Sequence, residues 1–189
     1  MNPQHPMSSD ENTNVVPAVT VNPFSAEDVI SILAERGWIA GAATPEQGQW
    51  CERAVAMLGA HAESREELAE LLGLVFRYEA REILARIESH VVLSRYAARE
   101  VLRQVALMLL DGAPVTSERF SEIVDALKGS MGLRLRELFY PLRLALAGRV
   151  GEGVLDRVIL LLDEAAGLSF SVGVKSARVR ILEFCAELD

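Results

Sequence analysis

One stretch in the carboxyl-terminal half of the chain constrains its fold more than any other. Residues Gly132–Gly148 read GLRLRELFYPLRLALAG, and their apolar side chains recur three and four positions apart. That spacing places them on one arc of an α-helix. The arc consists of Leu135, Leu138, Phe139, Leu142 and Leu146. Gly148 is a suitable helix stop, whereas Pro141 lacks an N–H and is expected to interrupt or kink the helix.

The rest of the chain repeats the helical pattern and shows no sustained alternation typical of strands. Three helix starts have the spacing of a capping box, in which a side chain reaches back three positions to a hydroxyl residue. These pairs are Ser25–Asp28, Thr44–Gln47 and Ser64–Glu67. Further helices are expected over residues 79–90, 94–110, 154–165 and 176–188, and another begins at Thr116 or Ser117. We therefore predict an all-α, multi-helix bundle.

The domain organisation follows from two changes in composition. Residues 1–23 are polar, rich in Asn, Ser and Pro, and lack a helical period, so we predict a disordered tail. An alternative is a short extended segment over residues 15–21 that lies on the body. Gly112 and Pro114 break the helical pattern. The body is then either one bundle or two packed helical subdomains, residues 24–112 and 113–189.

Charge is distributed unevenly along the chain. Hydrophobic residues make up 50% of the sequence, enough for a core, and the net charge is −8. An acidic protein is not expected to bind nucleic acid strongly and nonspecifically. Between Met131 and Val150, however, four arginines stand against a single glutamate. A local basic surface is therefore compatible with the acidic whole.

The residues that usually mark catalysis or metal binding do not form a pattern here. Cys51 and Cys185 lie in no CxxC motif and have no histidines at ligand spacing, so we expect no metal site and no cofactor. No nucleophile–base set stands out, so we expect no catalytic residue. The chain shows no signal-peptide pattern and no apolar run long enough to span a bilayer. We expect a soluble, cytoplasmic protein without a membrane partner.

The central stretch also carries a family resemblance. Leu138-Phe139-x-Pro141-Leu142-Arg143-x-Ala145-Leu146-x-Gly148 resembles the signature of the C-terminal, anticodon-binding domain of bacterial-type glutamyl-tRNA synthetases. The similarity extends more weakly from about Pro45 to Gly167, with the helices in a similar order. Three places depart from the family pattern. A lysine–glycine pair is replaced by Arg134–Leu135, a threonine by Ala147, and a glycine–proline pair by the segment around Glu152–Gly153.

This resemblance implies a freestanding anticodon-binding domain with a tRNA-related role and no catalysis. The two ATP-binding signatures of the synthetase catalytic domain do not occur in these 189 residues. The residues considered as RNA contacts are Arg136, Tyr140, Arg143, Arg149, Arg95, Arg99 and Arg103. Arginine can bind phosphate through two N–H groups, and aromatic rings stack on unpaired bases.

Each of these candidates has a structural alternative. Arg143 can instead pair with a buried carboxylate, and Arg136 can cap a helix end. Arg95, Arg99 and Arg103 are spaced by four and are expected to share one helix face, which can be an ordinary solvated face. The acidic charge and the departures from the family pattern also favour a second function. In that alternative the chain is a protein–protein interaction or scaffold domain that kept the fold, lost RNA binding, and binds another protein or itself.

Overall fold

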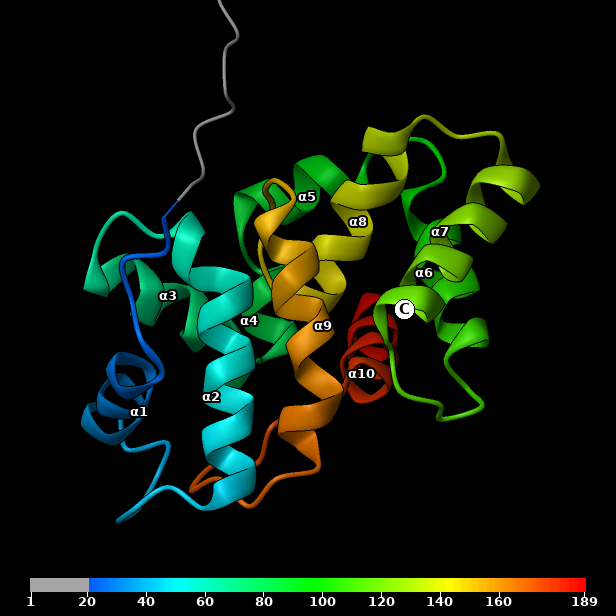
Figure 1. The fold of residues 1–189 in the computed structure, drawn as a ribbon. Coiled ribbons are helices and arrows are strands. Elements are labelled where there is room, and N and C mark those ends of the chain that lie inside the picture. The colour runs from blue at the N-terminus through cyan, green and yellow to red at the C-terminus, as the bar shows by residue number, and fades with distance from the viewer. Residues whose placement is uncertain (1–20) are drawn as a thin grey trace, which may run out of the picture.

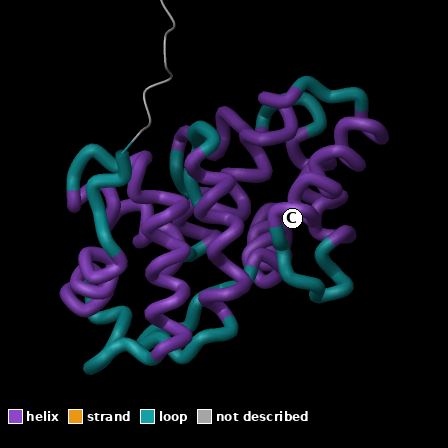
Figure 2. The backbone as a smooth tube through the Cα atoms, viewed as in Figure 1, coloured by secondary structure: helices purple, strands orange, loops and turns teal. Residues whose placement is uncertain are grey.

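The computed structural model of the chain describes residues 21–189, which fold into ten α-helices and one short 3₁₀ helix (Figure 1). The helices are, in chain order, α1 (Ala26–Glu35), α2 (Pro45–Leu58), η1 (Gly59–His61), α3 (Arg65–Phe76), α4 (Ala80–Leu84), α5 (Ile87–Leu93), α6 (Ala98–Met108), α7 (Ser117–Met131), α8 (Leu135–Ala147), α9 (Val154–Ala166) and α10 (Ala177–Leu188). No strand occurs in this described part of the chain (Figure 2). The predicted all-α fold is confirmed.

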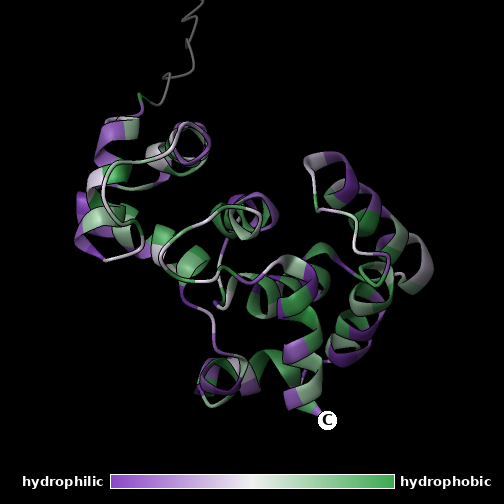
Figure 3. Cartoon of the chain, turned by 90° about the horizontal axis from the view of Figure 1, so that it is seen from below, coloured by the Kyte–Doolittle hydropathy of each residue, from purple (hydrophilic) through white to green (hydrophobic). Residues whose placement is uncertain are grey.

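The helices form three groups. Helices α1, α2 and α3 lie on one side, α6 and α7 lie on the other, and α8, α9 and α10 lie between them (Figure 1). Helix α9 packs on α2, α3 and α8, and α10 packs on α4, α6 and α8. Hydrophobic residues concentrate where the helices face one another (Figure 3). Helices from both sides of residue 112 therefore share contacts, and the division into two subdomains stays a prediction.

The predicted capping boxes are found at two helix starts and half-formed at the third. Both reciprocal contacts are present at the starts of α1 and α2. At the start of α3, the Ser64 hydroxyl accepts from the backbone N–H of Glu67 at 3.2 Å. The Glu67 carboxylate, however, accepts from the backbone N–H of Glu63 at 2.7 Å, one residue before the cap. Local side-chain bonds thus fix these helix starts, as expected.

Two helix boundaries differ from the prediction in the segment before α6. The helix expected over residues 79–90 is broken, because α4 ends at Leu84 and α5 begins at Ile87. Between them Arg86 has an extended backbone (φ −77°, ψ 145°) and donates its Nη1–H to the Gly148 carbonyl at 2.9 Å. The next helix begins at Ala98 rather than Ser94, because Ala97 adopts a left-handed conformation (φ 61°). Arg95 therefore lies outside α6.

Helix α8 runs without interruption through Pro141, so the expected interruption does not occur, and the alternative kink stays a prediction. The carbonyl that loses its helical donor belongs to Glu137, a half-buried residue in the first turn. Leu138 and Leu142 are buried as predicted. Leu135, on the same predicted arc, is 52% exposed, because α8 begins at this residue.

The carboxyl-terminal end of α8 is held by side chains from distant parts of the chain. The last carbonyl groups of a helix have no partner within it and need donors from elsewhere. Tyr78 Oη donates to the Ala145 carbonyl, Arg180 Nη1 to Leu146 at 2.9 Å, and Arg86 Nη1 to Gly148 at 2.9 Å. Each donor also places positive or partial positive charge at the negative end of the helix dipole. This anchoring leaves the amino-terminal end of α8 as the end that faces solvent.

The loop after α9 returns to the amino-terminal helices through an aromatic cluster. The Phe170 ring lies 5.4 Å from Trp50 and 4.9 Å from Phe76, both edge to face. Trp38 stacks on Phe76 at 4.7 Å. Edge-to-face and stacked contacts of this kind stabilise a core beyond simple burial. The carboxyl-terminal part of the chain is thereby joined to α1–α3.

The predicted disordered tail covers residues 1–23, of which 1–20 lie outside the described residues. The alternative extended segment, residues 15–21, also falls almost wholly outside them. Asn22 belongs to the body, since its Nδ2 donates to the Val55 carbonyl at 2.7 Å and its Oδ1 accepts from the Phe24 N–H at 3.1 Å. The ordered body therefore begins before residue 24.

Candidate nucleic-acid interface

The structure brings two arginines onto one tyrosine at the amino-terminal half of α8. The Cζ of Arg136 lies 5.6 Å from the centroid of the Tyr140 ring, and the Cζ of Arg95 lies 5.3 Å from it. Both distances are within the range of cation–π attraction. We call Arg95, Arg136 and Tyr140 the basic–aromatic cluster. Two of its members come from one helical turn, whereas Arg95 comes from the loop between α5 and α6.

The path of the chain before α6 explains how Arg95 reaches Tyr140. Helix α5 packs on α8 and ends at Leu93. The Arg95 N–H then donates to the Val92 carbonyl at 3.2 Å, and the Arg95 carbonyl accepts from the Ala98 N–H at 3.3 Å. Ala97, with its positive φ, completes this tight turn. The turn directs Arg95 toward α8 instead of along the α6 surface.

The charges of the cluster are not neutralised by neighbouring carboxylates. Both Arg95 and Arg136 are exposed, and neither takes part in an ion pair among the described residues. Arg134, also exposed, lies at the cap of α8. The nearby Glu137 carboxylate accepts from the Arg134 backbone N–H at 2.8 Å and is thereby engaged by the helix start. The amino-terminal end of α8 therefore presents positive charge to solvent on an otherwise acidic protein.

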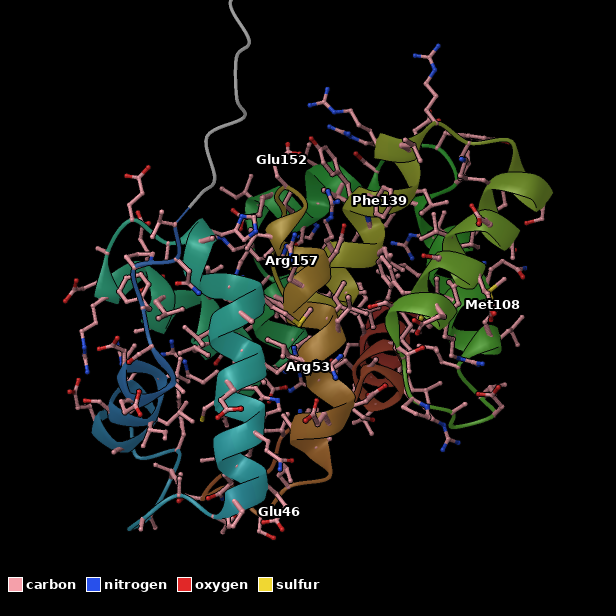
Figure 4. The ribbon with its side chains drawn as sticks, viewed as in Figure 1. Glu46, Arg53, Met108, Phe139, Glu152 and Arg157 are labelled. Carbon is pink, nitrogen blue, oxygen red and sulfur yellow. The ribbon has the colours of Figure 1, made fainter. Side chains whose placement is uncertain are left out.

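Arg143 has a different environment from the cluster. It is only 7% exposed, and its Nε and Nη2 bind the two oxygens of Asp156 at 2.7 and 2.8 Å. Its Nη1 donates to the Gly151 carbonyl at 3.0 Å, and its Cζ lies 4.6 Å from the Phe139 ring. Phe139 lies on α8 near the start of α9 (Figure 4). All three guanidinium nitrogens thus donate to Asp156 or Gly151 and fasten α8 to the start of α9, which is the structural alternative considered for this residue.

Arg149 is exposed but lies at the opposite end of α8 from the cluster. The helical rise separates it from Arg136 by roughly 20 Å. Arg149 lines a cavity of about 310 Å³ together with Glu67, Glu70 and Glu152. Carboxylates on the same wall oppose the binding of a phosphate there. The structure therefore does not join Arg149 to the basic–aromatic cluster.

The row of arginines spaced by four is divided in the structure. Arg95 lies before α6, so the prediction that all three share one helix face is wrong. Arg99 Nη1 donates to the Leu188 carbonyl at 3.3 Å, and Arg103 lies 3.7 Å from the Asp189 carboxylate. These two arginines therefore face the end of α10, and only Arg95 contributes to the cluster.

Arg180 is a buried cation that the sequence analysis missed. It is fully buried, and its guanidinium donates to the carbonyls of Leu74, Val75, Leu146 and Lys175 at distances of 2.6 to 3.1 Å. Its Cζ lies 4.5 Å from the Tyr78 ring. Burial lowers the pKa of Arg180 to about 10 and raises the pKa of Tyr78. The spacing with Ala177, Ile181 and Phe184 puts Arg180 on the apolar face of α10, and this spacing was the available signal.

The described residues contain no group of three or more metal-ligating side chains that could hold an ion. In the same part of the chain, no helix has the length and apolar character needed to span a bilayer. Burial raises the pKa of the Cys51 thiol to about 11 and also raises that of Cys185, which disfavours the reactive thiolate. What the surface offers instead is guanidinium groups around an aromatic ring.

Comparison with known proteins gives one match. A family model described as an anticodon binding domain matches residues 21–162. This range contains α1 to α8 and most of α9, and so includes the entire basic–aromatic cluster. No curated protein and no solved structure is found to match the chain.

Proposed function

Because the chain belongs to the anticodon binding domain family, we propose that it binds tRNA through the basic–aromatic cluster and performs no chemistry on it. The observation that carries the proposal is that the exposed guanidinium groups of Arg95 and Arg136 both lie over the Tyr140 ring. We further propose that the domain is of the glutamyl-tRNA synthetase type, on the strength of the Leu138–Gly148 signature. Non-catalytic binding is part of the same proposal.

The chemistry of the cluster fits an unpaired segment of RNA. Arginine binds phosphate oxygens through parallel N–H groups, and these contacts position a nucleic acid without reading its sequence. An aromatic ring can stack on any unpaired base. Base pairing in a duplex prevents this stacking, because the paired bases are already stacked on one another. The anticodon loop of tRNA supplies both groups together. The net charge of −8 opposes nonspecific binding, so the proposed affinity depends on a local basic surface and not on the overall charge.

The proposal is tested by titrating labelled total tRNA with micromolar protein at low salt and following fluorescence anisotropy. We expect saturable binding that weakens in the Arg95→Ala and Arg136→Ala variants. Each lost phosphate contact should reduce the slope of log K against log salt by about 0.7 for a single-stranded segment. Arg36→Ala is a matched control, because Arg36 is exposed at the end of α1, far from α8 (Figure 1). An absence of binding at low salt would refute the proposal.

A second candidate function rests on exposed apolar side chains. Ile87 and Val91, one turn apart on α5, are 83% and 53% exposed, and Leu107 on α6 is 59% exposed. Such residues are common at protein–protein contacts. This favours an interaction or scaffold domain that binds another protein or a second copy of itself. Size-exclusion chromatography with light scattering tests self-association, and a monomer at high concentration would count against that form of the alternative.

A further inference from the structure

Tyr96 is the most exposed large hydrophobic side chain among the described residues. Its side chain is 85% exposed, whereas the other two tyrosines, Tyr78 and Tyr140, are partly covered. A tyrosine ring held in water forgoes the stabilisation that burial gives. Tyr96 directly follows Arg95, whose guanidinium lies on Tyr140. Tyr96 is therefore the chain neighbour of one member of the basic–aromatic cluster.

The backbone around Tyr96 is held in an uncommon conformation. Ala97 is the only non-glycine residue with a positive φ in residues 21–189 (φ 61°, ψ 0°). This conformation costs an L-residue roughly 1–2 kcal/mol relative to the right-handed one. It closes the turn from Arg95 to Ala98, so Arg95 faces α8 while the adjacent Tyr96 side chain faces solvent. Strain of this kind often accompanies a functional position.

The charges around this turn favour an anionic ligand over an apolar one. Arg95, Arg134 and Arg136 are exposed and unpaired with carboxylates in the described part of the chain. The nearby carboxylates of Glu100 and Glu137 accept hydrogen bonds within their own helices, Glu100 from Gln104 Nε2 at 2.8 Å and Glu137 from the Arg134 backbone N–H at 2.8 Å. A ligand with both negative charge and flat aromatic faces can interact with the arginines and with the exposed tyrosine ring at the same time. Single-stranded nucleic acid has this chemistry.

We propose that the exposed Tyr96 ring is a platform on which an unpaired RNA base stacks, with Arg95 and Arg136, which lie over the Tyr140 ring, binding the phosphates beside it. This assignment rests on the proposed tRNA-binding function and adds Tyr96 as a binding residue. Ala97 is a positioning residue, because its left-handed backbone closes the turn that carries Arg95 and Tyr96. Stacking on an aromatic ring tolerates any base, because every base has a flat face. It also needs an unpaired base, so the platform should raise the affinity for single-stranded RNA and not for duplex.

The test uses the full chain with three labelled probes: total tRNA, a seven-nucleotide single-stranded RNA, and an RNA duplex. Tyr96→Ala should weaken binding of the single strand and of tRNA roughly 5- to 150-fold, the range that base–aromatic stacking supplies. Tyr96→Phe keeps the ring and should stay within about threefold of the original affinity. Binding of the duplex should be unchanged. Val179→Ala, which removes an exposed side chain from α10, is the control.

A spectroscopic readout separates stacking from a general loss of affinity. A 2-aminopurine base in the single-stranded probe should be quenched by the original protein and by Tyr96→Phe at saturation, and less so by Tyr96→Ala. The platform is overturned if the original protein binds tRNA and Tyr96→Ala binds it equally well. It is also overturned if Tyr96→Ala instead abolishes self-association seen by light scattering. Failure of the original protein to bind any probe overturns the proposed function as well, and the two failures are thereby distinguished.

Discussion

The ion pair between Arg143 and Asp156 makes a quantitative prediction about how α8 is held to α9. Asp156→Ala leaves the Arg143 guanidinium with the Gly151 carbonyl and the Phe139 ring but without an opposing charge. Breaking a buried pair in this way costs about 3–5 kcal/mol. The Asp156 side chain is 22% exposed, so water recovers part of that cost, and we expect a loss of about 2–3 kcal/mol. For a chain of this size the midpoint of thermal unfolding should fall by roughly 4–12 °C.

The assay is urea unfolding followed by far-UV circular dichroism, with Glu164→Ala as the control. Glu164, also on α9, pairs with Arg53 on α2, and both side chains are well exposed, at 38% and 47%. A surface pair of this kind contributes only about 0–1 kcal/mol. If Asp156→Ala costs no more than Glu164→Ala, the structural role of Arg143 is refuted.

A double variant separates stability from RNA binding at the same position. Arg143→Met combined with Asp156→Leu removes both charges, and it should recover most of the stability lost in Asp156→Ala because no unpaired charge remains. Its affinity for tRNA should match that of the original protein. A folded double variant that no longer binds tRNA would assign Arg143 to the interface instead.

Three further perturbations test the fold. In Gly59→Ala a methyl group would overlap the Asn22 side chain, so the Asn22–Val55 bond should be lost at a cost of about 1–3 kcal/mol in urea unfolding. Arg180→Leu leaves four carbonyl groups, two of them in buried and two in partly buried hydrogen bonds, without their donor, and we expect a loss of about 3–5 kcal/mol in the same measurement. Burial raises the pKa of Cys51 from 9.0 to about 11, so between these values the unfolded thiol ionises before the folded one. The free energy of unfolding should therefore fall as pH rises from 9 to 11, and Cys51→Ala should show a flatter profile.

The helices were predictable because their signals are local. Apolar residues three and four apart and hydroxyl caps at Ser25 and Thr44 operate within one or two turns. The break between α4 and α5 could not be predicted from local signals. It lies at Arg86, whose side chain donates to the Gly148 carbonyl, 62 positions away along the chain. The continuity of α8 through Pro141 depends likewise on packing that the sequence pattern does not display.

The candidate interface could be predicted only in part, because only the contact between Arg136 and Tyr140 depends on local spacing. Arg136 and Tyr140 are four residues apart on a helix, and this spacing alone predicts that they meet. The approach of Arg95 requires the left-handed Ala97, and alanine gives no signal for that conformation. For Arg143, sequence offered both a phosphate and a carboxylate as partners. Only the packing of α8 on α9 brings Asp156 into place.

Chemical footprinting of tRNA tests the central claim most directly. Bound protein should protect nucleotides of the anticodon loop, and the protection should be lost in the Arg95→Ala/Arg136→Ala double variant but kept in Arg36→Ala. Protection confined to the acceptor stem, or protection of the anticodon loop that survives the double variant, would contradict the assignment of the basic–aromatic cluster.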